Sequence, residues 1–274
     1  MKLDIYEKER PVGIQIFGAN LESMLKTVDI VEKSKPDIID INFGCPVKKV
    51  VSKGAGAGIL KDIDLMVKLS SEMVKRSSLP ITVKTRLGWD DKTIRIVEVA
   101  ERLQDVGIKA ISIHGRTRSQ MYKGNADWAP IAAVKNNSRM HIPVFGNGDV
   151  NSPEKARIMR DEYGLDGAMI GRASIGNPWF FKQVKEYLNE GTTRQLPSLE
   201  ERIYTAKRHL EMAIKWKGER LGLLETRRHY SNYFRGISNF KSFRTRLVTG
   251  DSIIEVMEVF KELEEKKASF EAIV

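Results

Sequence analysis

The stretch Asp37-Ile-Ile-Asp-Ile-Asn-Phe-Gly-Cys-Pro46 joins a run of β-branched residues to a turn. Residues 37–42 have the apolar, β-branched character of a short strand. Gly44 and Pro46 are turn formers, and the loop that follows is rich in glycine and lysine. Cys45, the only cysteine of the 274 residues, is therefore expected where a buried strand ends and a polar loop begins.

The same pattern of an apolar run followed by a helix-like stretch recurs through the first two thirds of the chain. Strands are predicted over residues 12–17, 37–42, 81–84, 110–114, 142–145 and 167–170. Helices are predicted over residues 21–32, 62–76, 92–106 and 153–163, with Asn20, Asp62, Asp91 and Ser152 as N-caps. Because the strands are nearly continuous in apolar character, they are typical of a parallel sheet covered by helices.

The ends of these strands favour a barrel over an open sheet. Polar or glycine residues follow five strands in turn: Asn42 and Cys45, Lys84 and Arg86, His114 and Arg116, Asn147 and Asp149, Gly171 and Arg172. A (β/α) barrel gathers all such ends on one face, whereas an open sheet concentrates its site at one switch point. No Gly-x-Gly-x-x-Gly motif follows a strand. The nearest match is the glycine-rich stretch 54–58, where Ile59 stands at the position of the third glycine, so Rossmann-type dinucleotide binding is not expected. The predicted fold class is therefore α/β, a TIM-type (β/α) barrel with about six strands, followed by a small all-α domain.

The domain boundary is predicted near residue 190. Residues 1–190 form the predicted barrel, with 178–189 as a last helix, and residues 191–274 form the predicted helical domain. The formal net charge is +10, and residues 199–250 hold 12 Lys and Arg against 5 Asp and Glu. Such a basic excess indicates a polyanionic partner such as nucleic acid, or only a feature of solubility.

Two features of the helical domain bear on this choice. One is the cluster Arg227, Arg228 and His229. The other is a set of aromatic residues, Tyr233, Phe234, Phe240 and Phe243, between which Lys and Arg residues stand in the sequence. Rings and cations together can stack on bases and bind phosphates, but the rings can equally be the core of a helical bundle.

Several strand-end residues are candidates for holding a cofactor. In barrels the loops after the last two strands often bind phosphate, and here they contain Asn147-Gly148-Asp149 and Gly171-Arg172. Lys84 would need an anionic partner if it pointed into the site. His114 suits a hydrogen bond to a cofactor or substrate, and Gln15 is a polar residue inside an otherwise apolar strand.

Cys45 is either an inert, buried thiol or a chemical tool, because a single cysteine excludes an intrachain disulfide. No histidine or carboxylate stands beside it in the sequence to remove its proton. An unassisted cysteine is mainly a thiol at neutral pH, which suits proton donation better than nucleophilic attack.

No second histidine or carboxylate stands at ligand spacing from His114, so no metal site is expected. There is no apolar run of about 18 residues, and the first ten residues are charged rather than signal-like, so a cytoplasmic protein without a membrane partner is expected.

The joint set of motifs resembles the bacterial tRNA-dihydrouridine synthases, particularly the B type. The matching segments are Gln15, Asn42-Phe-Gly-Cys-Pro46-Val-Lys48-Lys49, Gly54-Ala-Gly56, Lys84-Thr-Arg86-Leu-Gly-Trp89, Ile113-His-Gly-Arg-Thr-Arg118, Asn147-Gly-Asp149 and Ile170-Gly-Arg-Ala173. The resemblance covers essentially the whole chain, and the Arg227-Arg228-His229 helix is similar to part of that family's RNA-binding domain.

The resemblance implies a flavin enzyme that reduces a uridine of tRNA to 5,6-dihydrouridine with FMN and NADPH. Cys45 would protonate C5 of the base. Cofactor contacts would come from Gln15, Lys84, His114, Asn147, Gly148, Asp149, Gly171 and Arg172. Substrate contacts would come from Asn42, Lys48, Lys49, Arg116, Arg227, Arg228 and His229. The target base would have to be extruded from the folded tRNA to reach the barrel.

The chain departs from the resemblance at its start, because two further βα units and a Pro-Met-Ala-Gly turn are expected before the first strand and are not found. A shortened chain is the favoured explanation, and it puts folding and FMN affinity in question because the sheet would have open edges. Two alternatives stay open, an FMN barrel that reduces a small molecule and an inactive tRNA-binding remnant. A monomer is favoured.

Overall fold

The computed structural model describes residues 3–192 and 197–271. The chain divides into two compact units, Met1–Ile170 and Gly171–Val274, each of which is considered by itself. The predicted domain boundary at residue 190 coincides with the end of α7 (Phe180–Glu190), which lies inside the second unit. The extent of the functional domains stays a prediction.

The first unit is built on a six-stranded parallel sheet in the order of the chain. Its strands are β1 (Gly13–Ile16), β2 (Ile38–Asn42), β3 (Ile81–Arg86), β4 (Ala110–His114), β5 (Val144–Asn147) and β6 (Gly167–Met169). All six predicted strands are confirmed, although β3 and β5 each reach two residues further than predicted. Six parallel strands alternating with helices, followed by a helical region, confirm the predicted fold class.

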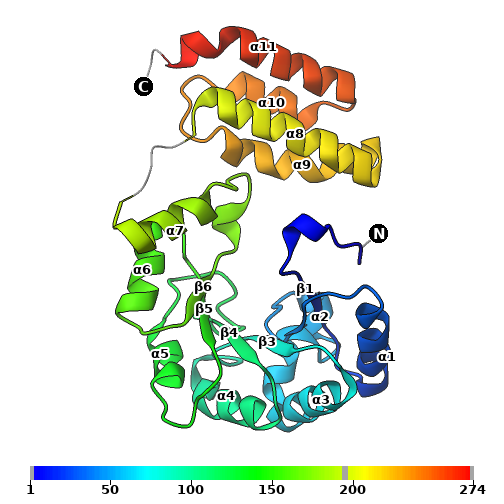
Figure 1. The fold of residues 1–274 in the computed structure, drawn as a ribbon, viewed down its shortest axis with the longest axis vertical. Coiled ribbons are helices and arrows are strands. Elements are labelled where there is room, and N and C mark those ends of the chain that lie inside the picture. The colour runs from blue at the N-terminus through cyan, green and yellow to red at the C-terminus, as the bar shows by residue number, and fades with distance from the viewer. Residues whose placement is uncertain (1–2, 193–196, 272–274) are drawn as a thin grey trace. The chain divides into compact units, whose positions relative to one another are not determined.

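Helices flank the strands of this unit (Figure 1). They are α1 (Leu21–Glu32), α2 (Lys48–Val51), α3 (Ile63–Arg76), α4 (Ile96–Asp105), α5 (Ala129–Lys135) and α6 (Pro153–Asp161). The predicted caps at Asn20, Asp62 and Ser152 are confirmed, since each side chain accepts a backbone N–H of the first turn. The predicted cap at Asp91 is wrong: Asp90 caps a short 3-10 turn instead, and α4 begins only after Arg95. The short helices α2 and α5 were not predicted.

The core of the first unit comes from alternate strand residues and one stripe of each helix. The fully buried residues include Ile39, Ile41, Val83, Ile111, Ile113, Val28, Met66, Leu69, Ala100 and Leu103. Burying each large apolar side chain contributes on the order of 2 kcal/mol to folding. The packed helices hold the strands in register, and the strand register places the site residues.

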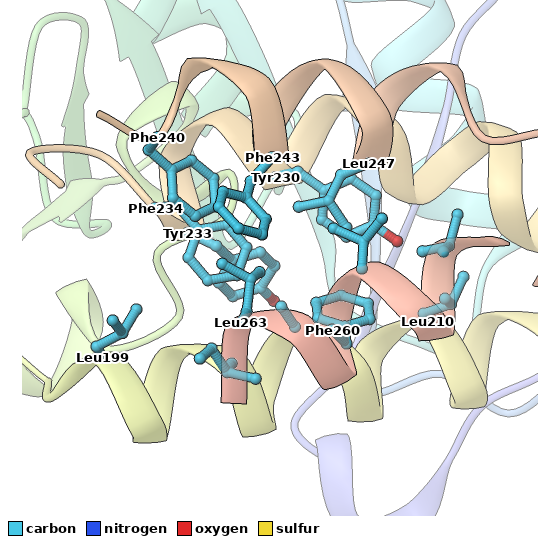
Figure 2. Packing of buried hydrophobic residues seen from close by; sticks show 14 of the residues in the cluster. Leu199, Leu210, Tyr230, Tyr233, Phe234, Phe240, Phe243, Leu247, Phe260 and Leu263 are labelled. Carbon is cyan, nitrogen blue, oxygen red and sulfur yellow. The ribbon is translucent and has the colours of Figure 1, made fainter. Parts of the chain in front are cut away.

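The second unit consists of a 3-10 turn, Arg172–Ser174, and five helices among the described residues. After α7 these are α8 (Leu199–Lys217), α9 (Glu219–Tyr233), α10 (Lys241–Thr249) and α11 (Ile253–Glu271). Figure 2 shows how the rings of Tyr233, Phe234, Phe240 and Phe243 pack in the interior of the helices. Phe240 stacks on Phe234 with ring centroids 4.7 Å apart. These rings form the bundle core, so they are not the exposed stacking surface that was the other interpretation. No helix among the described residues is long and apolar enough to cross a membrane.

Candidate active site

The parallel register gathers the strand-end residues of the first unit along one edge of the sheet. Asn42 pairs with Lys84, Arg86 with His114, and His114 with Asn147. These residues are far apart in the sequence, yet they occupy neighbouring positions on successive strands. The predicted gathering of Asn42, Lys84, His114 and Asn147 on one edge is therefore observed.

Cys45 lies in the turn that follows β2 and is half-buried. Its carbonyl oxygen accepts the N–H of Ala57 at 2.9 Å, which ties this turn to the 3-10 helix Gly56–Lys61. Gly56 has a φ of +55°, and a Cβ added to it would lie 2.9 Å from the Cβ of Cys45. Only glycine fits against the cysteine here without displacing it. Lys48 and Lys49 begin α2 just beyond the turn and are exposed.

A chain of hydrogen bonds leads along the strand ends to the cysteine turn. Gln15 donates through Nε2 to Oδ2 of Asp40 at 2.6 Å, and its Oε1 accepts from Nδ2 of Asn42 at 2.7 Å. Oδ1 of Asn42 then accepts the backbone N–H of Gly44 at 2.9 Å. The amides predicted to contact a cofactor and a substrate are thus connected to each other.

Arg86 is a second support of the cysteine turn. Its guanidinium is 2% exposed, and Nε donates to the carbonyl oxygen of Gly44 at 2.7 Å. Nη1 donates to the carbonyl oxygens of Thr117 and Met121 at 3.0 and 2.9 Å. Burial lowers the pKa of Arg86 to about 10, with a smaller contribution from Arg116. This side chain therefore joins the turn before Cys45 to the loop after β4.

Lys84 is a cation of the site that has no ion pair with the described residues. Burial, followed by the charge of Arg86, lowers the pKa of its ammonium to about 8, while the charge of Asp40 acts in the opposite direction. A half-buried ammonium without a bonded anion carries a desolvation cost. An anionic group of a ligand would offset that cost.

His114 is neutral at physiological pH. Its side chain is 5% exposed, and burial, followed by the charges of Arg86 and Lys84, lowers its pKa to about 3. Nη1 of Arg116 lies 3.4 Å from Nε2 of His114, and because an arginine only donates, Nε2 is the acceptor. The other ring nitrogen, Nδ1, then holds the proton.

Arg116 is only 2% exposed and forms a bidentate ion pair with Asp149, with N–O distances of 3.0 and 2.7 Å. Its Nε also donates to the carbonyl oxygen of Lys123. The predicted contact of Arg116 with a substrate stays a prediction, whereas its structural role in holding the loop after β4 against the turn after β5 is observed. Asp149 has a φ of +56° and also accepts the N–H of Ala126.

The predicted phosphate-binding turns divide between the two units. Asn147 donates through Nδ2 to the carbonyl oxygen of Met169 at 2.7 Å. Gly148 has a φ of +112°, and a Cβ there would lie 2.8 Å from the ring of His114, so this turn packs closely on the histidine. Gly171 and Arg172 open the second unit, and their role toward a cofactor stays a prediction.

The basic cluster on α9 is only partly available to a ligand. Arg228 is exposed, whereas Arg227 is half-buried and donates to the carbonyl oxygen of Gly250 and to Asp251. His229 is half-buried and accepts the N–H of Gly176 at 3.1 Å through Nδ1. Burial, followed by the charge of His209, lowers its pKa to about 4. Three consecutive helical residues point in different directions, which explains why one faces solvent.

No cluster of three or more His, Cys, Asp or Glu side chains suited to a metal ion occurs within residues 3–192 and 197–271.

Comparisons with known proteins identify the family of the chain. Residues 1–271 match the family Dihydrouridine synthase (Dus). The chain belongs to the dihydrouridine synthase family. Among its relatives, the probable tRNA-dihydrouridine synthase 1 of Synechocystis sp. is 37% identical over 253 residues, which cover 92% of this chain and 70% of the relative.

Two relatives named as B-type enzymes are similar to this dihydrouridine synthase family member to the same degree. The tRNA-dihydrouridine synthase B of Pseudomonas putida is 37% identical over 236 residues, which cover 86% of this chain and 69% of the relative. That of Vibrio cholerae is 35% identical over 258 residues, which cover 93% and 80% of the two chains. The resemblance inferred from the motifs is confirmed.

Two site residues of this Dus-family chain escaped the sequence-based prediction, Asp40 and Tyr122, whereas Arg86 was predicted at a strand end but was assigned no role. Asp40 lies inside the apolar run 37–42, and a charged residue at that position is a signal that was available. Tyr122 is 55% exposed, and its ring centroid lies 6.4 Å from that of His114 and 5.7 Å from the Arg86 guanidinium. Nothing local in the sequence indicates this last contact.

Proposed function

We propose that this chain is a tRNA-dihydrouridine synthase that reduces a uridine of tRNA to 5,6-dihydrouridine, with FMN as cofactor and NADPH as reductant. The names of the relatives support the substrate and the product. The arrangement of Cys45, Lys84 and His114 at one sheet edge supports the chemistry. A cytoplasmic location is part of the proposal, because tRNA is the substrate.

The observation that carries the flavin assignment is the Lys84 ammonium. It is half-buried and has no ion pair among the described residues, so it suits the electron-rich edge of an isoalloxazine ring. Gln15 supplies an amide for the same ring, and the neutral His114 and the Asn147–Gly148–Asp149 turn would complete the contacts. FMN reduced by NADPH would supply a hydride to C6 of the uracil ring.

Cys45 would supply the matching proton to C5. Addition of a hydride at C6 and a proton at C5 accounts for all the atoms that distinguish dihydrouracil from uracil. The sulfur left behind is a thiolate, and it would lie close to two cations, since a negative charge on Cys45 raises the pKa of both Lys84 and Arg86. These cations stabilise the anionic form that proton transfer leaves.

Asn42 would hold the uracil, because its amide has both a donor and an acceptor and lies two residues before the turn of Cys45. The surrounding RNA would meet exposed cations. Lys48 and Lys49 in the first unit and Arg228 in the second are available to phosphates. Arg227 and His229, which bond to their own chain, would support the fold of α9 as well.

The test uses the full chain, FMN, NADPH and tRNA that lacks dihydrouridine, with dihydrouridine measured by mass spectrometry of the digested RNA. Wild-type protein should bind FMN and form dihydrouridine. Cys45→Ala should lower the rate by at least about 100-fold and keep FMN and tRNA binding. The exposed Ser52, which follows α2, provides a control, and Ser52→Ala should leave the rate unchanged. A wild-type protein that binds FMN and is reduced by NADPH but forms no dihydrouridine in any tRNA would refute the proposal.

A further inference from the structure

Asp40 occupies a central position among the polar residues at the strand ends. It pairs in register with Gln15 on β1 and with Thr82 on β3, and it lies two residues before Asn42 on β2. Side chains two apart on a strand share a face of the sheet, so Asp40 and Asn42 are on one face. The Asp40 carboxylate accepts from both neighbours, from Gln15 at 2.6 Å and from Thr82 at 2.7 Å.

The hydrogen-bond chain from Asp40 to Gly44 has a single possible direction. A carboxylate can only accept, and a backbone N–H can only donate. Between these two ends stand the amides of Gln15 and Asn42, and each has a donor and an acceptor that exchange places when the amide flips. With an acceptor at one end and a donor at the other, only one orientation of each amide satisfies every bond.

We propose that Asp40 is a positioning residue that sets the orientation of the Gln15 and Asn42 amides and, through Asn42, holds the turn that precedes Cys45. The importance of this role rests on the proposed function, because the orientation of the two amides decides whether a donor or an acceptor faces the flavin ring and the base. A flip of either amide would put the wrong group at the same place. The geometry of the hydrogen-bond chain from Asp40 to Gly44 does not depend on that function.

The negative charge of Asp40 offers a competing explanation for any effect of substituting this residue, because the charge raises the pKa of the Lys84 ammonium. The two explanations separate on substitution. In Asp40→Asn, the new amide can accept from Gln15 through its oxygen and donate to the Thr82 hydroxyl, so the direction is kept while the charge is lost. In Asp40→Leu, Gln15 loses its acceptor, and both direction and charge are lost.

A reciprocal exchange provides a sharper test. Gln15→Glu alone places two carboxylates side by side and interrupts the hydrogen-bond chain between Asp40 and Gly44. Adding Asp40→Asn restores it, because the new amide donates to Glu at position 15, whose other oxygen still accepts from Asn42. Thr82→Val is the matched control, since it removes a hydrogen-bond donor to Asp40 that is not part of the hydrogen-bond chain leading to Gly44.

Two readouts apply to the whole 274-residue chain. The first is the rate of alkylation of Cys45 by iodoacetamide without FMN, which reports on the turn and requires no ligand. The second is FMN affinity, from quenching of flavin fluorescence. We expect Asp40→Leu and Gln15→Glu to raise the alkylation rate about three- to tenfold and to weaken FMN binding by a similar factor, as befits one hydrogen bond. Asp40→Asn and Thr82→Val should stay within about twofold of wild type in both.

The double variant decides the matter if Asp40→Leu fails to fold. Recovery of the wild-type alkylation rate in Gln15→Glu/Asp40→Asn supports the directional chain. The proposal is overturned if the double variant is no better than Gln15→Glu, if Asp40→Asn is as impaired as Asp40→Leu, or if a folded Asp40→Leu is alkylated like wild type. Because alkylation requires neither FMN nor tRNA, these outcomes are independent of whether the proposed function holds.

Discussion

The Nε atom of Arg86 donates a hydrogen bond of 2.7 Å to the carbonyl oxygen of Gly44, the residue directly before Cys45. The same guanidinium bonds to the loop after β4, so one buried cation connects two loops that carry site residues. The position of Cys45 therefore depends on a side chain that starts from a different strand.

Replacement of Arg86 by alanine should destabilise the first unit by about 3 kcal/mol, because three carbonyl oxygens, two of them in buried hydrogen bonds, would lose their donor. Urea unfolding followed by tryptophan fluorescence would measure the change. Arg95, whose ion pair with Glu98 is exposed, serves as the control, and Arg95→Ala should have little effect. Equal effects of the two substitutions would contradict the role assigned to Arg86.

Lys84 should make FMN binding depend on pH. Its pKa is lowered to about 8, so the ammonium is increasingly lost above that pH, and affinity for an anionic edge of the ligand should fall. A flavin fluorescence titration from pH 7 to 9.5 should show the decline in wild type. Lys84→Gln should bind FMN more weakly and with less dependence on pH, whereas Lys53→Gln, at an exposed loop position, should follow wild type. Wild-type affinity that stays constant over this range would argue against contact between Lys84 and the flavin.

His114 should remain a neutral imidazole from pH 8 down to about pH 5, because its pKa is lowered from 6.5 to about 3. In the unfolded chain the same group binds a proton below about pH 6.5, so its contribution to stability is constant above that pH and decreases as the pH falls toward 3. The slope is at most about 1.4 kcal/mol per pH unit. An NMR titration, with His114→Gln to assign the signal, would measure the pKa, and a midpoint near 6.5 would contradict the burial seen here.

Gly56→Ala should disturb Cys45 more than a positive φ alone explains. Gly124 also has a positive φ, +65°, but a Cβ there would meet no atom within 4 Å, whereas at Gly56 it would meet the cysteine. Both alanine variants should lose about 1 kcal/mol to backbone strain. Only Gly56→Ala should also change the alkylation rate of Cys45. Identical alkylation rates in the two variants would show that the turn yields without moving the thiol.

The local parts of this fold were predictable because they depend on short stretches of sequence. The six strands follow from β-branched runs, and the turn at Cys45 follows from Gly44 and Pro46. The start of α4 was placed too early because Asp90 and Asp91 are both plausible caps, and the capping of a short 3-10 turn by Asp90 is decided by backbone geometry.

The partners of the site residues were not predictable from the sequence, because they depend on the register between strands. Asp40 and Arg86 have roles only through residues on other strands and loops. The cluster Arg227–Arg228–His229 presented the opposite difficulty: three neighbours in sequence are not neighbours on a helix surface, and two of them are turned toward their own chain.

The pairing of Asn42 with Lys84, and of His114 with both Arg86 and Asn147, has a consequence for how this site can vary. Side chains alternate between the faces of a sheet, so a one-residue insertion or deletion inside a single strand would turn its site residue away and move every residue after it. The loops between the strands and helices can change length without that effect. The number of residues between the start of each strand and its last polar residue is therefore as much a part of the site as the polar residues themselves.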